Sequence, residues 1–422
     1  MKGECRIKVE QVFDIFESRG FIEQVTDREG LLELLSTPMT CYIGFDPTAK
    51  SFHIGSLLPI MSLVHMQNAG HRPIVVIGGG TALVGDPSGK TEMRPIMTRE
   101  EIDENAEALK KQLSRFIDFS DGKALMVNNA DWLMYLGYID FLRDIGRHFS
   151  VNRMLTAESY RARLETGLNF IEFNYMLLQA YDFWYLFKHY DCRLQMGGND
   201  QWGNILAGAD LIRRLEGETA YALTSPLLST SSGLKMGKTH KGAIWLDAGQ
   251  TSPFDYYQYW INQDDRDAER FLSLFTLLPM DEIRRLGSLE GPDLREAREV
   301  LAYEATKLCH GQEEADMARE ASRQLFTDVE DSQWTEGYSD STPTFTITPE
   351  ELDQGIPAYI LFEKAGLCKS RGDARRLIAQ GGGYLNGQTI QAFDQTIDTR
   401  NLRNDSLLLR AGKKRYMRIS LS

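Results

Sequence analysis

The sequence of 422 residues is poor in cysteine and histidine, and it lacks any long apolar run. Its five cysteines are scattered without a C-x-x-C pair, and its seven histidines show no metal-ligand spacing, so we expect no structural zinc and no other protein-held metal. No apolar segment approaches the roughly 18 residues that a membrane span needs. The charged first residues lack the apolar core of a signal peptide. We therefore expect a cytoplasmic protein with no membrane contact.

Charge is distributed unevenly along the chain. The whole sequence carries a net charge of −13, which by itself argues against nucleic-acid binding. From residue 356 to the end, however, 12 basic residues stand against 5 acidic ones, whereas the preceding 355 residues have 35 against 55. A basic segment on an acidic body predicts a nucleic-acid contact confined to the C-terminal part.

Strand and helix signals alternate over the first half of the chain, which predicts an α/β fold with a Rossmann-like, doubly wound parallel sheet. The expected strands cover residues 42–45, 74–77, 125–128 and 193–196, and long helical patterns cover 98–116 and 138–149. From about residue 252 the strand signal gives way to helices, and a polar, turn-rich stretch then precedes the basic segment. The expected parts are a catalytic sheet domain over 1–247, an α-helical domain over 248–334, a linker over 335–355 and a small α+β module over 356–422.

The segment over residues 41–59 reads as a buried strand that turns at Pro47 into a helix. A helix that follows a parallel strand directs unpaired N–H groups toward the sheet's carboxyl edge, where they bind phosphate. His53 and Thr48 add side-chain donors there, and Gly55 leaves room for a nucleotide. The alternative is an ordinary helix start in an α/β domain.

The glycine-rich stretch over residues 78–94 is one residue too short for a P-loop, and Pro87 lacks an N–H that a phosphate cradle uses. It is either a simple turn or a site in which Asp86 is a fixed carboxylate and Lys90 and Arg94 contact phosphate.

A polar stripe marks the helical segment over residues 175–182, where Tyr175, Gln179 and Asp182 share one face. Such a stripe is usually apolar core, and a buried aspartate needs a partner. In the later stretch over residues 195–204, a buried strand ends in two glycines, and Asp200 follows where a carboxylate can bind a ribose. A helix N-cap is the alternative role for Asp200.

A serine-, threonine- and glycine-rich loop carries Lys235 and Lys238, and together these five stretches resemble the bacterial-type tyrosyl-tRNA synthetases, a class I aminoacyl-tRNA synthetase family. Residues 53–56, His-Ile-Gly-Ser, resemble the HIGH signature. Residues 235–239, Lys-Met-Gly-Lys-Thr, resemble the KMSKS loop. The resemblance runs from about residue 10 to the end of the chain.

The resemblance implies tyrosine–tRNA ligase activity in two steps, both of which rest on positioning and charge stabilisation. Tyrosine first attacks the α-phosphate of ATP and releases pyrophosphate, and the acyl group then passes to the tRNA 3′ end. Magnesium is expected to accompany ATP rather than to be held by protein. The implied catalytic residues, which hold the phosphates, are Thr48, His53, Lys90, Arg94, Lys235, Lys238 and Thr239. The implied ATP-binding residues are Gly44, Asp46, His53, Gly55, Ser56, Gly198, Asp200, Lys235 and Lys238.

The resemblance also assigns the amino-acid pocket. Tyr175, Gln179 and Asp86 are expected to take the ammonium group of tyrosine, and Gln195 and Gln201 to lie near its carboxylate. Tyr42 and Asp182 are expected to bond the phenol hydroxyl, which favours tyrosine over tryptophan. A tryptophanyl-type synthetase, a non-catalytic RNA-binding paralogue and another nucleotidyltransferase remain as alternatives.

The segment from residue 359 onward resembles the S-four-like RNA-binding fold. The implied partner is the tRNA for tyrosine, bound through its phosphates and shape. The candidate RNA-binding residues are Lys369, Arg371, Arg375 and Arg376. The resemblance further implies a homodimer in which one tRNA spans both subunits, with the dimer surface expected on helices between about residues 100 and 165. A merely basic, solvated module is the alternative.

Overall fold

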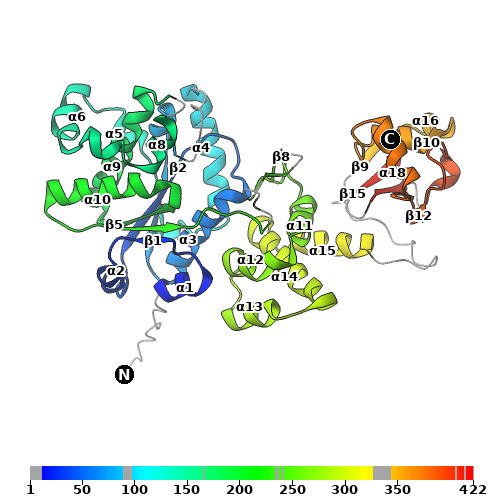
Figure 1. The fold of residues 1–422 in the computed structure, drawn as a ribbon, viewed down its shortest axis with the longest axis horizontal. Helices are drawn as coiled ribbons and strands as arrows, with labels where there is room; N and C mark the ends of the chain where they lie inside the picture. Colours follow the sequence, from blue (N-terminus) through cyan, green and yellow to red (C-terminus); the bar gives the residue numbers. More distant parts are fainter. Residues whose placement is uncertain are drawn as a thin grey trace. The chain divides into compact units, whose positions relative to one another are not determined.

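The computed structural model describes residues 12–88, 97–164, 167–231, 233, 236, 238–239, 242–326, 344–403, 406–412 and 415–421. The chain divides into two compact units. The first contains Met1–Ser252 and Tyr259–Gly311, and the second contains Pro253–Gln258 and Gln312–Ser422. Figure 1 shows the elements of each.

The first unit is built on a six-stranded sheet in the order β1-β6-β5-β2-β3-β4. Five strands run parallel, and the short β1 is antiparallel to β6 at the edge. The strands are β1 (Gln24–Val25), β2 (Thr40–Phe45), β3 (Arg72–Ile77), β4 (Leu125–Asn128), β5 (Cys192–Gly198) and β6 (Tyr221–Ser225). The predicted strands at 42–45, 74–77, 125–128 and 193–196 are confirmed, and β6 was not predicted.

Helices surround this sheet (Figure 1). Those of the first unit are α1 (Val12–Arg19), α2 (Arg28–Leu35), α3 (Leu57–Asn68), α4 (Arg99–Leu113), α5 (Ala130–Leu133), α6 (Tyr138–Asp144), α7 (Val151–Met154), α8 (Glu158–Leu164), α9 (Phe170–Tyr190), α10 (Trp202–Glu216), α12 (Ala268–Phe275), α13 (Met280–Gly287) and α14 (Leu294–His310). Helix α11 (Pro253–Ile261) spans both units. The helical patterns predicted over 98–116 and 138–149 correspond to α4 and to α6 with the short turn after it.

Alternation along the strands gives the sheet two apolar faces. On one face, Tyr42, Ile74 and Val76 pack in a single cluster with Phe183 of α9 and Ile212 of α10. Helix α3 contacts β2, β3 and β5, and it is buried on nearly all sides. Burial on both faces explains why the strands read as continuous apolar runs, and the predicted doubly wound sheet is confirmed.

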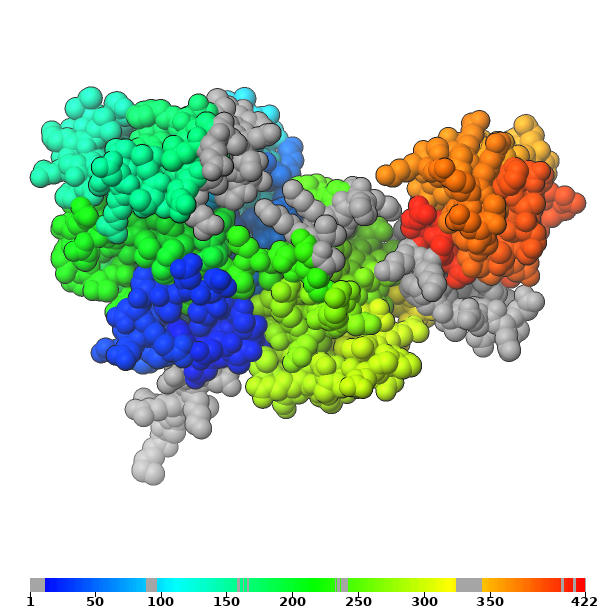
Figure 2. All heavy atoms as spheres, viewed as in Figure 1, coloured from blue at the N-terminus to red at the C-terminus, as the bar shows by residue number. Residues whose placement is uncertain are grey.

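The predicted boundary between a sheet domain ending at 247 and a separate helical domain differs from the structure, which places residues 259–311 in the same compact unit as the sheet. Helix α1 lies against α12 (Figures 1 and 2). Arg19 of α1 donates from Nη1 to the carbonyl oxygens of Ser273 and Thr276, at 2.9 and 3.0 Å. These carbonyls lie at the end of α12, where a cation is favoured, so one buried side chain joins the two predicted domains.

The second unit contains α15 (Gln312–Phe326) and a C-terminal α+β domain. The domain has a five-stranded sheet in the order β12-β11-β14-β15-β9 and a two-stranded β10-β13 pair. Its elements are β9 (Thr344–Ile347), α16 (Pro349–Asp353), β10 (Ile356–Pro357), α17 (Ala358–Lys364), α18 (Arg371–Ala379), β11 (Gly383–Leu385), β12 (Gln388–Thr389), β13 (Thr396–Ile397), β14 (Ser406–Ala411) and β15 (Arg415–Leu421).

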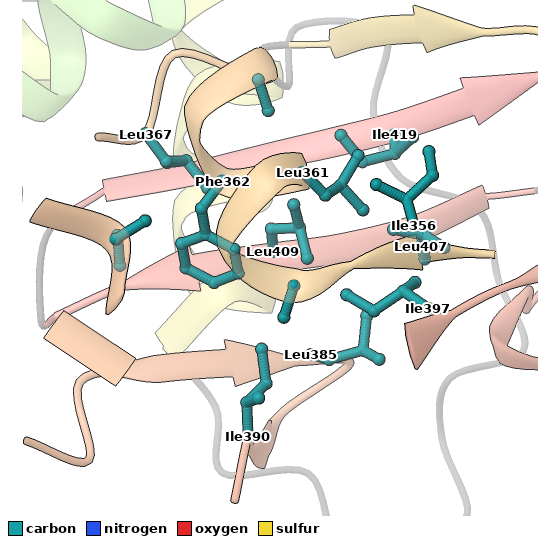
Figure 3. Close-up of a cluster of buried hydrophobic side chains, with 14 of the residues drawn as sticks. Ile356, Leu361, Phe362, Leu367, Leu385, Ile390, Ile397, Leu407, Leu409 and Ile419 are labelled. Atoms are coloured by element: carbon teal, nitrogen blue, oxygen red, sulfur yellow. The ribbon is translucent and has the colours of Figure 1, made fainter. Parts of the chain in front are cut away.

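The core of this domain is formed by aliphatic side chains from both helices and strands, together with Phe362 (Figure 3). The prediction of a linker over 335–355 is wrong from residue 344 onward. Strand β9 pairs in parallel with β15, and Ile347 is buried in the core. The alternation of polar and apolar residues over 344–347 is a strand signal that the surrounding polar composition obscured.

Candidate active site

A cavity of about 720 Å³ opens at the carboxyl ends of β6, β5, β2 and β3. Strands β2 and β5 are neighbours in the sheet but not in sequence, because the chain adds β3 and β4 on one side of β2 before it crosses to the other. A crevice beyond the strands at such a switch point is where α/β sheets bind ligands. Tyr42 of β2 and Gln195 of β5, which are paired in register, both line the cavity.

Asp182 is a carboxylate buried in the wall of this cavity. Trp132 donates from Nε1 to one of its oxygens at 2.7 Å, and Asn129 donates from Nδ2 to the other at 2.9 Å. Burial raises the pKa of Asp182 to about 7, and the two donors oppose this rise. The side chain is therefore a fixed hydrogen-bond acceptor in a dry environment.

Two buried polar atoms that line the same cavity have no hydrogen-bond partner among the described residues. They are the hydroxyl of Tyr42 and the Oε1 of Gln195. The Tyr42 side chain is 1% exposed, and its pKa is raised well above the ordinary value by burial and by the charge of Asp182. Unpaired buried polar groups are rare, and at a cavity wall they indicate that a ligand supplies the missing partner.

Asp46, just beyond the end of β2, is a second carboxylate in the cavity. It accepts from the Tyr175 hydroxyl of α9 at 2.9 Å and from the Thr81 hydroxyl at 2.7 Å. Because Pro47 ends the strand, Asp46 stands at the carboxyl edge within reach of both elements. The polar stripe of α9 (Tyr175, Gln179 and Asp182) therefore faces the end of β2.

Asp86 is a third carboxylate in the cavity and is also buried. It accepts from the Ser88 N–H and from Nε2 of Gln201, both at 2.8 Å. Burial raises the pKa of Asp86 to about 6, and the charge of Asp46 adds to the rise. With four acidic side chains (Asp46, Asp86, Asp182 and Asp200) and no lysine or arginine among its described lining residues, the cavity attracts cations.

His53 caps the start of the helix that leads into α3. Its Nδ1 accepts from the Gly55 N–H at 2.9 Å, so the neutral imidazole carries its proton on Nε2 and presents a donor. Gly55 is required here because a Cβ would lie 2.6 Å from Cε1 of the His53 ring. Backbone bonds from Ile54 to Ile244 and from Leu246 to Phe52 tie this helix start to the segment after the lysine loop.

Two further glycines shape the wall of the cavity. A Cβ at Gly44 would meet no atom within 4 Å, so this position borders open space. A Cβ at Gly198 would lie 2.6 Å from an oxygen of Asp200. Gly44 thus leaves room for a ligand, whereas Gly198 leaves room for the carboxylate that follows it.

The structure brings together at this cavity every predicted site residue of the first unit whose side chain it describes. They are Tyr42, Gly44, Asp46, Thr48, His53, Gly55, Ser56, Asp86, Tyr175, Gln179, Asp182, Gln195, Gly198, Asp200 and Gln201. Lys90, Arg94 and Lys235 lie outside the described residues. For Lys238 and Thr239 only the backbone is described, as strand β7 (Lys238–Thr239) paired with β8 (Gly242–Ala243).

Comparison with known proteins gives two family matches. Residues 35–327 match "tRNA synthetases class I (W and Y)", and residues 335–419 match "Tyrosine--tRNA ligase SYY-like C-terminal domain". The tyrosine–tRNA ligase of Syntrophus aciditrophicus is 56% identical over 426 residues, covering 98% of this chain and 99% of that protein. The chain belongs to the class I tyrosyl-tRNA synthetases. A second tyrosine–tRNA ligase, from Desulfatibacillum aliphaticivorans, is also 56% identical, over 97% of this chain and 99% of its own.

Solved tyrosyl-tRNA synthetases share the fold. The C-terminally truncated mitochondrial enzyme of Aspergillus nidulans aligns with a TM-score of 0.68 and 32% identity, over 75% of this chain and 94% of that chain. The corresponding enzyme of Coccidioides posadasii gives 0.64 and 30%, over 74% and 91%. A tryptophanyl-tRNA synthetase from Encephalitozoon cuniculi, at 17% identity, shows the fold alone.

This membership makes the chain a tyrosine–tRNA ligase, an ATP-dependent aminoacyl-tRNA synthetase of class I. The predicted family, fold class and activity are confirmed. Because the curated relatives are tyrosine–tRNA ligases over nearly the whole chain, the tryptophanyl, non-catalytic and nucleotidyltransferase alternatives are set aside.

Sequence reasoning missed the residues of this tyrosyl-tRNA synthetase that hold the predicted ones in place. Asn129 and Trp132 fix Asp182, and Thr81 fixes Asp46. Asn204 donates to Gln179 at 3.0 Å and to Gln201 at 3.2 Å. A partial signal exists for Asn129, because it follows β4 directly and so stands at the carboxyl edge of the sheet.

The predicted RNA-binding residues lie on or just before α18 in the C-terminal domain. Lys369 is exposed. Arg371 pairs with Glu363 at 3.1 Å, and Arg376 pairs with Asp373. The structure therefore gathers the four residues, although it neutralises two of them.

The described residues were also compared with the arrangements that bind metal ions and that cross membranes. Within it, no group of three or more His, Cys, Asp or Glu side chains is arranged to hold a metal ion. None of its helices combines the length and the apolar character that crossing a bilayer requires.

Proposed function

We propose that the cavity binds L-tyrosine with its phenol hydroxyl between Asp182 and Tyr42. The phenol donates to the Asp182 carboxylate and accepts from the Tyr42 hydroxyl, so one ligand oxygen satisfies both groups. The observation that carries this proposal is the unpaired, fully buried hydroxyl of Tyr42 beside a cavity that also holds a fixed buried acceptor. Phenylalanine would leave the Tyr42 hydroxyl without a partner, at a cost of about 1–3 kcal/mol, and would lack the hydrogen bond to the Asp182 carboxylate.

The ammonium group of the substrate is assigned to the acidic middle of the cavity. We assign it to Tyr175, Gln179 and Asp86, with Asp46 adding negative charge through its contact with Tyr175. The carboxylates of Asp46 and Asp86 support this placement, because a nearby cation relieves the repulsion by which Asp46 raises the pKa of Asp86. Gln195 and Gln201 are proposed near the carboxylate of tyrosine, where their amide groups can donate.

ATP is proposed to lie along the glycine-rich side of the cavity, with its ribose at Gly198 and Asp200 and its adenosine beside Gly44. The Nε2 proton of His53 and the start of α3 face the phosphates, as do Thr48 and Ser56. A tyrosine carboxylate oxygen attacks the α-phosphorus, the bond to the bridging oxygen breaks, and pyrophosphate leaves with magnesium. The tRNA 3′-terminal ribose hydroxyl then attacks the acyl carbon, and AMP leaves.

Cationic groups for the leaving pyrophosphate are absent from the described lining of the cavity. We assign this task to Lys90, Arg94, Lys235 and Lys238, with the neutral hydroxyl of Thr239 as an additional hydrogen-bond donor. Lys238→Ala should slow ATP–pyrophosphate exchange by about 100-fold, because stabilisation of developing phosphate charge is lost, while tyrosine binding is retained. Equal loss of exchange and of tyrosine binding would contradict a role confined to the phosphates.

The direct test of the pocket is ATP–pyrophosphate exchange with tyrosine, tryptophan and phenylalanine in turn. Exchange with tyrosine alone is expected. Exchange with phenylalanine at a comparable rate would remove the hydroxyl-reading role of Asp182 and Tyr42, and no exchange with any of the three would remove the activation step.

A homodimer is proposed through an apolar patch formed by α5, α6 and the segments around them. Its exposed side chains include Met134, Tyr135, Tyr138, Ile139 and Leu142, with Val151, Leu164, Phe170 and Ile171 from nearby segments. Tyr135 is 85% exposed and Ile139 is 70% exposed, and such clustered exposure is typical of a surface that a partner covers. A second copy supplies the same patch in a two-fold interface.

The oligomeric state is tested by light scattering. The parent is expected to be a dimer, and Ile139→Asp is expected to yield monomers because a charge would be buried at the interface. Leu277→Asp, at another exposed apolar side chain outside the patch, is the control and should stay dimeric. A dimeric Ile139→Asp variant would place the interface elsewhere.

We propose a cytoplasmic location because the described cysteines are unpaired. Cys41, Cys192, Cys309 and Cys368 are buried, and none of these four forms a disulfide, which fits a reducing compartment. The proposed RNA partner is the tRNA for tyrosine, bound in part by the C-terminal domain.

A further inference from the structure

Arg375 differs from its neighbours on α18 in how its charge is used. Arg371 and Arg376 each pair with a carboxylate, whereas Arg375 has no hydrogen bond or ion pair to any residue that the structure describes. Its guanidinium instead lies over the ring of Tyr359, 4.1 Å from the centroid. Stacking leaves the N–H groups at the edge of the guanidinium open, and these are the groups that contact phosphate and base edges.

Phe393 completes the same surface from a different segment. Its ring lies 5.5 Å from the Arg375 guanidinium and 6.1 Å from the Tyr359 ring, which it meets edge-on at 74°. The backbone holds this arrangement, because the Tyr359 N–H donates to the Phe393 carbonyl at 3.0 Å. The turn between β12 and β13 is thereby fixed against the start of α17.

The Phe393 side chain is 39% exposed, although the domain has an apolar core that could hold a phenyl ring. Among the described residues from 344 onward, it is the only exposed large apolar side chain. An aromatic ring held rigidly at the surface beside an unneutralised arginine is the arrangement that binds an unstacked nucleotide, with the base on the ring and the phosphate on the cation.

We propose that Phe393 stacks against an unpaired base of the tRNA and that Arg375, held by Tyr359, contacts a phosphate of the same nucleotide. This rests on the proposed tRNA partner and deepens it. Arg371 and Arg376 contribute less, because binding RNA would require each to exchange an existing ion pair for a new one.

The test measures binding of a tyrosine tRNA transcript to the full-length protein at several salt concentrations. Arg375→Gln is expected to raise Kd about tenfold and to lower the slope of log Kd against log salt by about one unit, because one phosphate contact is lost. Arg376→Gln, the matched control on the same helix, should change the slope by much less. Equal slope changes for the two variants would overturn the role of Arg375.

Stacking is separated from charge by a second pair of variants. Phe393→Ala is expected to raise Kd about tenfold with the salt slope unchanged, whereas Phe393→Trp should bind at least as tightly as the parent. If Phe393→Ala binds like the parent, or if Phe393→Trp is as weak as Phe393→Ala, base stacking is wrong. Far-UV circular dichroism and thermal melting identify any variant that fails to fold.

Tyrosine-dependent ATP–pyrophosphate exchange, measured without RNA on the same samples, should equal the parent's in all four variants. If the unmodified protein shows no tyrosine-dependent exchange, the proposed function is wrong. Normal exchange combined with unchanged tRNA binding in Arg375→Gln and Phe393→Ala would refute only the nucleotide site.

Discussion

The two ends of the active-site cavity are built in different ways. At the proposed phenol end, buried side chains from β2, α9 and the segment after β4 converge, and Asp182 has a donor on each oxygen. At the proposed nucleotide end, glycines and the capped helix start at His53 expose backbone and leave open space. In the proposed binding mode, fixed and desolvated partners distinguish the amino acid, whereas donors that tolerate solvent bind the phosphates.

The largest effect is expected at Asp182. Above about pH 7, Asp182→Asn keeps the shape but replaces an ionised acceptor with a weaker neutral one, and its NH₂ group faces one of the two donors, Asn129 or Trp132. We expect kcat/KM for tyrosine in exchange to fall about 100-fold, with less effect on phenylalanine, because a hydrogen bond to a charged group contributes about 1.5–3 kcal/mol. Asp281→Asn, an exposed carboxylate on α13, is the charge-matched control. If the ratio of kcat/KM for tyrosine to kcat/KM for phenylalanine is unchanged, Asp182 does not read the phenol hydroxyl.

His53 has two proposed functions that substitutions can separate: its Nδ1 caps the helix start at Gly55, and its Nε2 proton faces the phosphates. His53→Ala removes both the acceptor that caps Gly55 and the Nε2 donor, whereas His53→Asn retains an acceptor suited to the cap. We expect both variants to raise KM for ATP or lower the exchange rate by about tenfold, and only His53→Ala to lose about 1 kcal/mol of stability. Tyrosine binding, followed by equilibrium titration, should be unaffected. Full rescue of exchange by His53→Asn would assign His53 to capping alone.

Tyr42→Phe is expected to change stability and binding in opposite directions. Removing a buried hydroxyl without a partner should stabilise the ligand-free protein by about 1 kcal/mol, while KM for tyrosine rises about fivefold. Thermal unfolding with and without tyrosine measures both effects, and the tyrosine-induced rise in Tm should shrink. A destabilised ligand-free variant would mean that the hydroxyl already has a partner.

A pH dependence of stability is expected at Asp182. The pKa of Asp182 is about 7 when folded, against 3.8 ordinarily, so between these values the folded protein keeps a proton that the unfolded chain releases. This contribution is fully present below about pH 4 and is lost as the pH rises through 7. Relative to Asp182→Asn, the parent should therefore lose stability between about pH 4 and pH 7 in urea unfolding. A constant difference would mean that the carboxylate is ionised throughout.

Much of the site could be predicted from the sequence, because motifs at the ends of parallel strands converge whatever the loops do. The stripe of Tyr175, Gln179 and Asp182 follows from helical spacing alone, and so does its position facing Asp46 once the sheet is assigned. Asn129, Trp132 and Thr81 could not be predicted, because their roles depend on distances between segments that are far apart in sequence. Strand β9 was missed because a short alternation carries little signal within a polar stretch. The docking of α12 on α1 and α3 joins segments that are about 200 residues or more apart in sequence.

The packing of Gly55 under the His53 ring has a consequence for how this sequence can vary. A Cβ at position 55 would lie 2.6 Å from Cε1 of the imidazole, so any larger residue there must displace the ring from its capping position. Substitutions at the two positions are therefore energetically coupled, and the double substitution should cost less than the sum of the single ones. In a library randomised at both sites, acceptable residues would appear as pairs, so that this helix start evolves as a two-residue unit.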